Sequence, residues 1–296
     1  MSKLIIIDGN AILHRAFHAL PPLTTKRGEP INAVYGLISM LLRVIQDLKP
    51  TNLIVCFDRP EPTFRHKAFT AYQAQRPTTA SDLSSQFEKA KRVIAAFGIP
   101  IYEKAGFEAD DVIGTIADKV GGDVVIVTGD RDQLQLVNKR VKVYMPQGGF
   151  STAKLMGEEE VKEKMGVPPK LVDDYKALVG DPSDNYPGVS GIGPKTALKL
   201  LDEFGSLDSI YNNLDKIPEK VSQKLKDGRK QARLSKKLAT IVRDVPLEIN
   251  FEDSGKWDLD TQAALSLFNE FGFKTLTERI KKVGKELDLE KQMSLL

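Results

Sequence analysis

The chain has 296 residues, of which 41% are hydrophobic and 28% charged, with a formal net charge of +3. These proportions indicate a soluble globular protein that is long enough for two domains. No apolar stretch approaches the roughly 18 residues of a membrane span. The first strand-like run begins within three residues, so we expect no signal peptide. The single cysteine, Cys56, forms no intrachain disulfide, so we expect a cytoplasmic protein.

Three short apolar runs in the chain each end in an aspartate. The runs and their aspartates are Lys3–Ile7 with Asp8, Leu53–Phe57 with Asp58, and Val124–Gly129 with Asp130, which Asp132 follows closely. Short runs rich in Val and Ile are typical of strands that are buried on both faces of a parallel sheet. Ligands bind beyond the carboxyl ends of such strands, so we expect the aspartates to meet at one edge. Apposed carboxylates repel one another unless a cation neutralises them, which predicts a divalent metal.

Residues 1–145 alternate strand-like and helix-like segments, which predicts a βαβ domain. Apolar residues at helical spacing predict helices at Val34–Leu48, Phe87–Phe97 and Glu108–Val120. From Arg59 to Ser84 this pattern fails, and basic residues are interleaved with aromatic ones. These residues are Arg59, Phe64, Arg65, His66, Lys67, Phe69, Tyr72 and Arg76. Such an excursion between two core elements could contact a polyanion.

From about residue 158 the chain is mostly helical. The expected helices are Glu158–Met165, Pro169–Val179, Lys195–Phe204, Leu207–Asn213, Glu219–Val242 and Asp258–Ile280. Strand-like alternation returns only at Leu247–Phe251. These patterns predict a helical second domain.

Two further acidic groups join the strand-end aspartates. Glu108–Asp111 begins an expected helix, where acids can simply complement the helix dipole. Asp181–Asn185 follows an apolar helix, and its residue types also suit a plain turn. The complete acidic set is Asp8, Asp58, Glu108, Asp110, Asp111, Asp130, Asp132, Asp181 and Asp184. Together, nine acids at one edge favour a metal centre over either alternative.

The residue types of this set indicate which metal it would hold. The histidines, at positions 14, 18 and 66, have no zinc-like spacing, and we interpret His14 and His18 as ordinary helix residues. An all-oxygen site suits Mg²⁺ or Mn²⁺. So many carboxylates suggest two ions, which at about 4 Å from each other can activate water and stabilise the leaving oxygen of a phosphodiester.

A glycine-rich segment, Gly188–Ala197, begins another expected helix. Gly191 and Gly193 allow a tight turn, and Lys195 and Thr196 stand at the helix start, where exposed N–H groups bind phosphate. A plain interhelical turn is the alternative. The string from Gly191 to Ala197 resembles the helix–hairpin–helix family, which binds the DNA backbone without reading the bases.

Six motifs occur in a fixed order along nearly the whole chain. They are Asp8-Gly9-Asn10, Phe57-Asp58, Gly106–Asp111, Thr128–Asp132, Gly180–Asn185 and Gly188–Ala197. This series resembles the 5′ nuclease (5′-3′ exonuclease) domain of bacterial DNA polymerase I, within the flap endonuclease superfamily. The resemblance spans about residues 2–280.

The resemblance implies an α/β fold with a mostly parallel, PIN-like sheet flanked by helices. Residues 1–165 would form the nuclease domain, with a helical arch at about 59–84. Residues 166–280 would form a helix–three-turn–helix DNA-binding region with C-terminal helices, and 281–296 a flexible tail.

The resemblance also implies roles for individual residues. Ligands of a first metal would be Asp8, Asp58, Glu108 and Asp110, and those of a second would be Asp130, Asp132 and Asp181, with Asp111 and Asp184 acting through water or in the outer shell. In the arch, Arg65 and Arg76 match phosphate-contacting arginines, and Tyr72 matches a neighbouring aromatic residue. Expected DNA contacts are Arg15, Lys67, Gly191, Gly193, Lys195 and Thr196. Backbone carbonyls near Ser190 and Ile192 would bind K⁺.

The sequence departs from the family at Gln73, where the family usually has a lysine that approaches the scissile phosphate. Gln73 cannot supply that charge, so either another cation such as Lys67 substitutes or turnover is reduced. The last residues, Gln292–Leu296, resemble a peptide that docks on the sliding clamp, although the final aromatic is absent and a frayed tail is the alternative.

Three functional hypotheses follow. The first is a monomeric, Mg²⁺- or Mn²⁺-dependent 5′ nuclease that acts on DNA flaps, nicks or overhangs, RNA-primed ones included, in primer removal and repair, as a stand-alone protein or an excised domain. The second is a non-catalytic binder of branched DNA, for which nine acids would be unfavourable. The third is a phosphatase of the strand-end aspartate type, which would require Asp where Asn10 stands.

Overall fold

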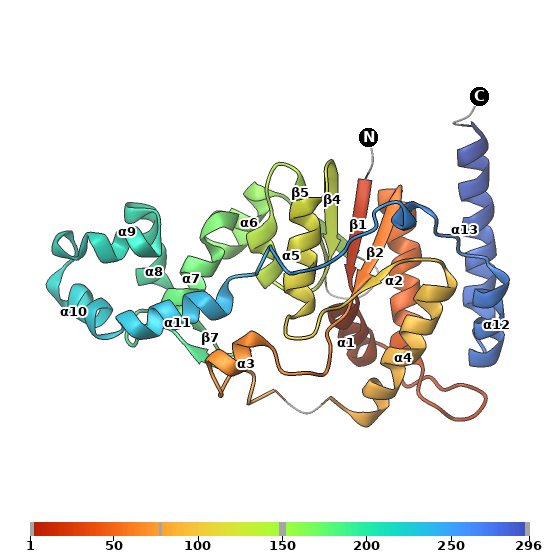
Figure 1. Ribbon diagram of the computed structural model, residues 1–296, viewed down its shortest axis with the longest axis horizontal. Helices are drawn as coiled ribbons and strands as arrows, with labels where there is room; N and C mark the ends of the chain where they lie inside the picture. The colour runs from red at the N-terminus through yellow and green to blue at the C-terminus, as the bar shows by residue number, and fades with distance from the viewer. Residues whose placement is uncertain (1–2, 77–78, 148–151, 294–296) are drawn as a thin grey trace.

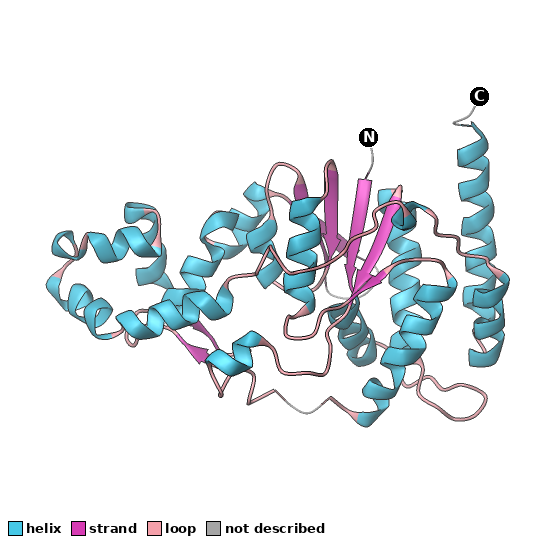
Figure 2. Cartoon of the chain, in the orientation of Figure 1, coloured by secondary structure: helices cyan, strands magenta, loops and turns pink. Residues whose placement is uncertain are grey.

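The structure is a computed structural model that describes residues 3–76, 79–147 and 152–293. At its centre is a six-stranded sheet with the order β3-β2-β1-β4-β5-β6 (Figures 1 and 2). The strands are β1 (Lys3–Asp8), β2 (Asn52–Cys56), β3 (Ile101–Tyr102), β4 (Asp123–Val127), β5 (Val141–Gln147) and β6 (Thr152–Met156). Neighbours from β3 to β5 pair in parallel, and β6 runs antiparallel to β5. The expected mostly parallel α/β sheet is confirmed.

Side chains of the central strands alternate between two apolar cores, one on each face of the sheet. In β1, Leu4 and Ile6 pack in the core beneath α5 (Ala109–Lys119). Ile5 and Ile7 pack in the opposite core beneath α1 (Gly9–Ala19) and α2 (Asn32–Leu48). Burial on both faces is therefore why these strands read as nearly continuous apolar runs.

The last two helices return to this second core. The helices α12 (Gln262–Phe271) and α13 (Lys274–Met293) lie beyond α2 and α4 (Ser81–Ala96), on the opposite side of the sheet from the helical region (Figure 1). Phe268 and Leu276 share the core that contains Ile5 and Ile7. The chain thus crosses the molecule after its helical region.

The helical region projects from the β6 side of the sheet (Figure 2). Its helices are α6 (Glu158–Met165), α7 (Val172–Val179), α8 (Pro194–Phe204), α9 (Leu207–Asn212), α10 (Glu219–Asp227) and α11 (Arg229–Ala239). A two-stranded ladder, β7 (Gly180–Asp181) with β8 (Tyr186–Pro187), follows α7. The short helix α3 (Phe64–Ala68) lies in the basic excursion. The 3-10 turns are Asp132–Leu136, Pro169–Leu171, Leu214–Lys216 and Asp253–Gly255.

Three expectations about secondary structure are wrong. The expected helix Glu219–Val242 is two helices that meet at Gly228 (φ −88°, ψ 5°), whose missing Cβ position lies only 2.7 Å from Val189 Cγ1. The expected helix Asp258–Ile280 is also two, separated at Gly272 in the left-handed conformation (φ 79°). Residues 247–251 form no strand but an irregular segment, whose apolar side chains pack partly buried on the core.

Within the described residues, the structure contains no helix that is long and apolar enough to cross a membrane.

Candidate metal centre and active site

A cleft of about 730 Å³ opens at the carboxyl ends of β1, β2 and β4. Seven of the nine candidate acids line it, namely Asp8, Asp58, Glu108, Asp110, Asp130, Asp132 and Asp184, and Glu61 lies at the same cleft. Asp111 and Asp181 are buried next to this lining. All nine candidate acids therefore converge on one region, although they come from separate segments of the chain.

Asp8 links the end of β1 to the start of α1. Its Oδ1 accepts a hydrogen bond of 2.9 Å from the Ala11 N–H, and its Oδ2 accepts one of 2.7 Å from the Thr128 hydroxyl. Burial raises the pKa of Asp8 to about 7, and the charges of Asp58 and Asp130 add to this effect. A cation in the cleft would relieve that penalty.

Three more carboxylates of the cleft meet at the N-terminus of α5. Glu108 is the N-cap residue, and burial raises its pKa to about 7. Asp58, which follows β2, accepts a 2.6 Å hydrogen bond from the Ala109 N–H. The Asp110 carboxylate accepts a 2.7 Å bond from the Gln133 amide, while burial and the nearby charge of Asp130 raise its pKa.

Asp130 and Asp132 lie in a turn and not in an extended segment. The backbone turns at this point, where Asp130 Oδ1 accepts a 2.8 Å hydrogen bond from the Asp132 N–H and a 3-10 helix begins. Both side chains still line the cleft. Burial raises the pKa of Asp132 to about 7.

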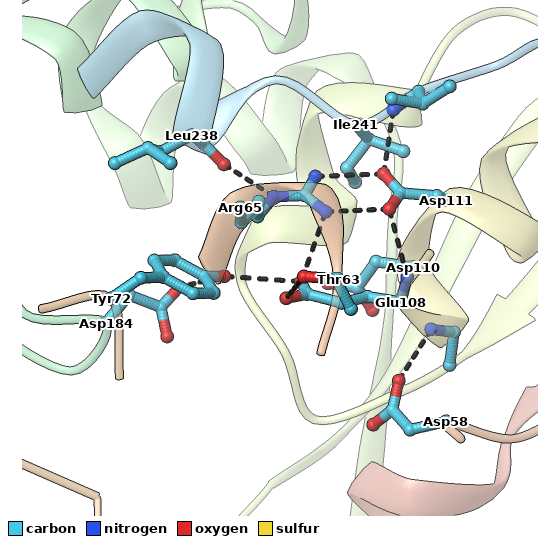
Figure 3. Close-up of polar contacts among 12 residues, drawn as sticks. Asp58, Thr63, Arg65, Tyr72, Glu108, Asp110, Asp111, Asp184, Leu238 and Ile241 are labelled. Atoms are coloured by element: carbon cyan, nitrogen blue, oxygen red, sulfur yellow. Dashed lines mark hydrogen bonds and ion pairs between the residues drawn. The ribbon is translucent and has the colours of Figure 1, made fainter. Parts of the chain in front are cut away.

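Arg65 is buried and lies inside the network shown in Figure 3. Its guanidinium binds both carboxylate oxygens of Asp111, at 2.7 and 2.9 Å, and donates to the carbonyls of Leu238 and Thr240. Glu108 lies 3.2 Å away. The side chains of Arg65 and Asp111 are only 3% and 0% exposed. All three guanidinium nitrogens of Arg65 are thus bonded internally, although the residue borders the cleft, and its expected phosphate contact stays a prediction.

Asp132, Asp181 and Asp184 form a second cluster, in which one oxygen from each residue lies within 4.8 Å of the others. Lys176, on α7, donates to Asp132 and, at 2.5 Å, to Asp181. Burial alone would lower the pKa of Lys176, but the charges of Asp132 and Asp181 outweigh burial and raise it. Lys176 was not among the candidate residues predicted from the sequence. The available signal was that this lysine lies on the inner face of an apolar helix, five residues before Asp181.

Three arch residues converge on Asp184. The Tyr72 hydroxyl donates to Asp184 at 3.4 Å and to Glu108 at 3.2 Å. The Gln73 amide donates to Asp184 at 3.2 Å, and Arg76 pairs with it at 2.5 Å. Lys67 is exposed and does not line the cleft, whereas Arg76 does. Arg76 is therefore better placed than Lys67 to supply the charge that Gln73 lacks.

The other expected DNA contacts lie outside the cleft. Gly193 caps α8, and Lys195 is exposed in its first turn. Thr196, next in that turn, is half-buried. The Lys224 amine donates to the Gly191 carbonyl at 3.0 Å, in the loop where Ser190 and Ile192 were expected to bind K⁺. Arg15 lies on α1, away from the cleft lining.

The donor set fits a hydrated divalent cation. Every carboxylate in it is a hard oxygen ligand. Two buried polar atoms, Gln133 Oε1 and the Tyr186 hydroxyl, have no hydrogen-bond partner among the described residues. The amide nitrogen of Gln133 donates to Asp110. Tyr186 lies close enough to Asp132, Asp181 and Asp184 to feel their charges. Water bound around a cation would satisfy such atoms.

This sheet edge, with its carboxylate cleft and basic arch, defines an α/β phosphodiesterase of the nuclease class. The chain belongs to the 5′-3′ exonuclease family. The family model of the N-terminal resolvase-like domain matches residues 3–166, and that of the C-terminal SAM fold matches residues 167–262. Family membership supports a catalytic nuclease over a non-catalytic binder of branched DNA.

Curated relatives match nearly the whole chain. It is 44% identical to DNA polymerase I of Caldicellulosiruptor bescii over 94% of its length, and 37% identical to DNA polymerase I of Bacillus subtilis over 98%. These matches cover 33% and 34% of the relatives, so the chain spans about a third of their length.

Solved structures share the fold at low sequence identity. The zinc-bound T5 5′-exonuclease has a TM-score of 0.66 at 22% identity, covering 95% of this chain and 99% of that one. The catalytic core of Rad2 in complex with DNA substrate has a TM-score of 0.60 at 18% identity, covering 95% and 92%. Both structures therefore share the α/β fold and the helical region of this chain.

Proposed function

We propose that this chain is a structure-dependent 5′ nuclease that hydrolyses phosphodiesters at 5′ ends, flaps or nicks of DNA with two divalent ions. The convergence of nine carboxylates on one cleft, beside the arch residue Arg76, carries this proposal. Without cations such a cleft would repel a phosphate backbone, so a binder of DNA alone would have no use for it.

Mg²⁺ or Mn²⁺ is the proposed cofactor. When bound, two such ions supply an activated water and neutralise charge on the phosphate. Asp8, Asp58, Glu108 and Asp110 would hold the first ion, and Asp130, Asp132 and Asp181 the second. Asp111 would act from the outer shell, because it caps the N–H of Glu108 at 3.1 Å and thereby fixes that ligand.

The arch would orient the DNA. Arg76 is half exposed at the cleft rim, so its guanidinium can transfer from Asp184 to a phosphate. Tyr72 is buried and bridges Glu108 to Asp184, so it would position both carboxylates. The exposed turn at Gly191–Lys195, together with Thr196 and Arg15, would contact the duplex backbone, with K⁺ as a further ligand at Ser190 and Ile192.

We further propose that the protein acts as a monomer in the bacterial cytoplasm, where it serves primer removal and DNA repair. The candidate clamp peptide, Gln292–Leu296, falls on residues whose side chains lie outside the described part, as do residues 294–296 altogether. Its role stays a prediction, which deleting residues 292–296 and measuring binding to a bacterial clamp would test.

One assay tests the proposed function. A 5′-labelled flap duplex is incubated with the protein in Mg²⁺, in Mn²⁺ and in EDTA. We expect cleavage in either metal, none in EDTA, and a loss of at least about 100-fold in Asp130→Ala, because a ligand of the ion is removed. Asp118→Ala, a change of an acid on the far end of α5, is the matched control. Binding without cleavage in both metals would favour the non-catalytic binder, and phosphate release from small esters would favour a phosphatase.

A further inference from the structure

The second carboxylate cluster already contains a cation that belongs to the protein. Lys176 is 9% exposed, and its ammonium is hydrogen-bonded to Asp132 and Asp181. Lysine is rarely buried to this degree unless it is paired with acids. Its position on α7, one turn before the β7 strand that carries Asp181, fixes the ammonium between these two acids.

The first cluster, by which we mean Asp8, Asp58, Glu108 and Asp110, differs in this respect. Asp8 and Asp110 accept hydrogen bonds from neutral groups, namely the Ala11 amide, the Thr128 hydroxyl and the Gln133 amide. Among the described residues, no lysine forms an ion pair with Asp8, Asp58, Glu108 or Asp110. The cation near this cluster, Arg65, pairs mainly with Asp111 behind it. A lysine of the protein therefore neutralises part of the second cluster, and within the described part of the chain no lysine does so in the first.

We propose that Lys176 is an internal counter-cation that occupies the second metal position in the metal-free protein. This inference rests on the proposed two-ion function. A divalent ion held by Asp132 and Asp181 would need their carboxylate oxygens at about 2.1 Å, and the ammonium already takes one oxygen of each carboxylate. Two cations cannot share them, because their charges repel strongly in a buried site. The second ion must therefore displace Lys176, whereas the first ion displaces no lysine.

Two consequences follow. The second ion binds more weakly than the first, so the sites fill in sequence as the metal concentration rises. The ammonium also keeps Asp132 and Asp181 together when no metal is bound, since buried like charges would otherwise separate. Lys176 is thus a positioning residue that sets the affinity of the second site.

The test measures Mn²⁺ binding to the whole chain without DNA, by counting free Mn²⁺ with electron paramagnetic resonance. For the unmodified protein we expect two classes of site. In Lys176→Met, the dissociation constant of the weaker class should fall at least about tenfold, while that of the tighter class stays unchanged. Lys176→Arg, which keeps the charge, should retain weak second binding.

Lys236→Met is the matched control. Lys236 also pairs with two aspartates, Asp173 at 2.8 Å and Asp174 at 2.6 Å, but these lie outside the cleft. Both dissociation constants should stay unchanged in this variant. An unchanged or weaker second site in Lys176→Met would overturn the proposal. Fewer than two Mn²⁺ ions on the unmodified protein would instead overturn the two-ion function itself.

A second measurement avoids the variant altogether, in case Lys176→Met does not fold. Amine acetylation of the unmodified protein is followed by mass spectrometry as Mn²⁺ is added. Reactivity of Lys176 should rise several-fold over the concentration range of the second binding step, because the displaced ammonium leaves its carboxylates. Reactivity that stays constant or falls through that step would contradict displacement.

Discussion

Arg65 lies in the arch segment but faces the protein interior. Its guanidinium joins three elements, because Asp111 belongs to α5 while Leu238 and Thr240 lie at the end of α11. Asp111 in turn accepts the N–H groups of Glu108 and Val242. This one ion pair therefore fixes α5, the base of the arch and the helical region relative to one another.

Removing the charge of Arg65 should be costly. In Arg65→Met, Asp111 would remain as a buried and unpaired carboxylate, so we expect a loss of about 3–5 kcal/mol in the free energy of unfolding, measured with urea. Arg92→Met removes an exposed arginine that pairs with Glu270, and should cost less than about 1 kcal/mol. Equal losses in the two variants would show that the buried pair has no special role.

Gln73 is the second residue whose contribution to cleavage can be measured by substitution. It adopts a left-handed conformation (φ 54°) that brings its amide to Asp184. A lysine there would add positive charge at the cleft, so Gln73→Lys should raise the single-turnover rate of flap cleavage several-fold. Gln75→Lys makes the same charge change at an exposed position nearby. If both variants raise the rate equally, the effect is general attraction for DNA; if neither does, the missing lysine is irrelevant.

At the scale of elements, the β7–β8 ladder holds Asp181 and Asp184 at the cleft. The ladder is short, but its backbone is very tightly packed: Gly180 has φ 79° and ψ −178°, a conformation essentially limited to glycine. A Cβ atom on Gly180 would lie 2.4 Å from the Gly188 nitrogen. The same contact joins the acidic turn to the start of the glycine hairpin.

Gly180→Ala tests this contact. We expect a loss of about 2–4 kcal/mol in the free energy of unfolding, because both the backbone conformation and the close approach to Gly188 are violated. Gly205→Ala is the control, since Gly205 also has a positive φ (84°) but no atom within 4 Å of its Cβ position, so it should lose only about 1–2 kcal/mol. A smaller loss at Gly180 than at Gly205 would disprove the packing argument.

At the scale of the whole molecule, the cleft makes stability depend on pH and metal. Burial raises the pKa values of Asp8, Glu108 and Asp132 to about 7 in the folded protein, so these groups bind protons more tightly when folded than when unfolded. Their contribution to stability is complete below the unfolded pKa values near 4 and is lost as the pH rises to about 7. The pKa of Asp181 is lowered by Lys176 and by hydrogen bonds despite burial, so Asp181 takes up its proton only at more acidic pH.

The melting temperature should therefore fall between about pH 5 and about pH 8 in EDTA, as measured by calorimetry. Mg²⁺ should reverse this fall, because the ion binds only the deprotonated carboxylates. Asp8→Asn removes one of the groups whose pKa is raised, and should therefore flatten the dependence. A melting temperature that rises over this range in EDTA, or that Mg²⁺ leaves unchanged, would be inconsistent with a strained acidic cleft.

The sequence by itself determined the parallel sheet and most of the cleft. Doubly buried strands need continuous apolar runs, and the side chains that follow them must meet at one edge, so Asp8, Asp58 and Asp130 could be placed from local patterns alone. Glu108 and Asp181 could be added because helix starts and turns have local signatures.

Only the tertiary structure decided what neutralises these acids. Arg65 lies in a basic and aromatic segment, which suggested a DNA contact, and Lys176 belongs to no motif of the sequence. Both are nevertheless buried and ion-paired. The partners of Arg65 are 46 residues away at Asp111 and 173 away at Leu238, a separation that no local periodicity encodes. Pairing of buried charges depends on which elements pack together, and that packing is settled by the two cores as a whole.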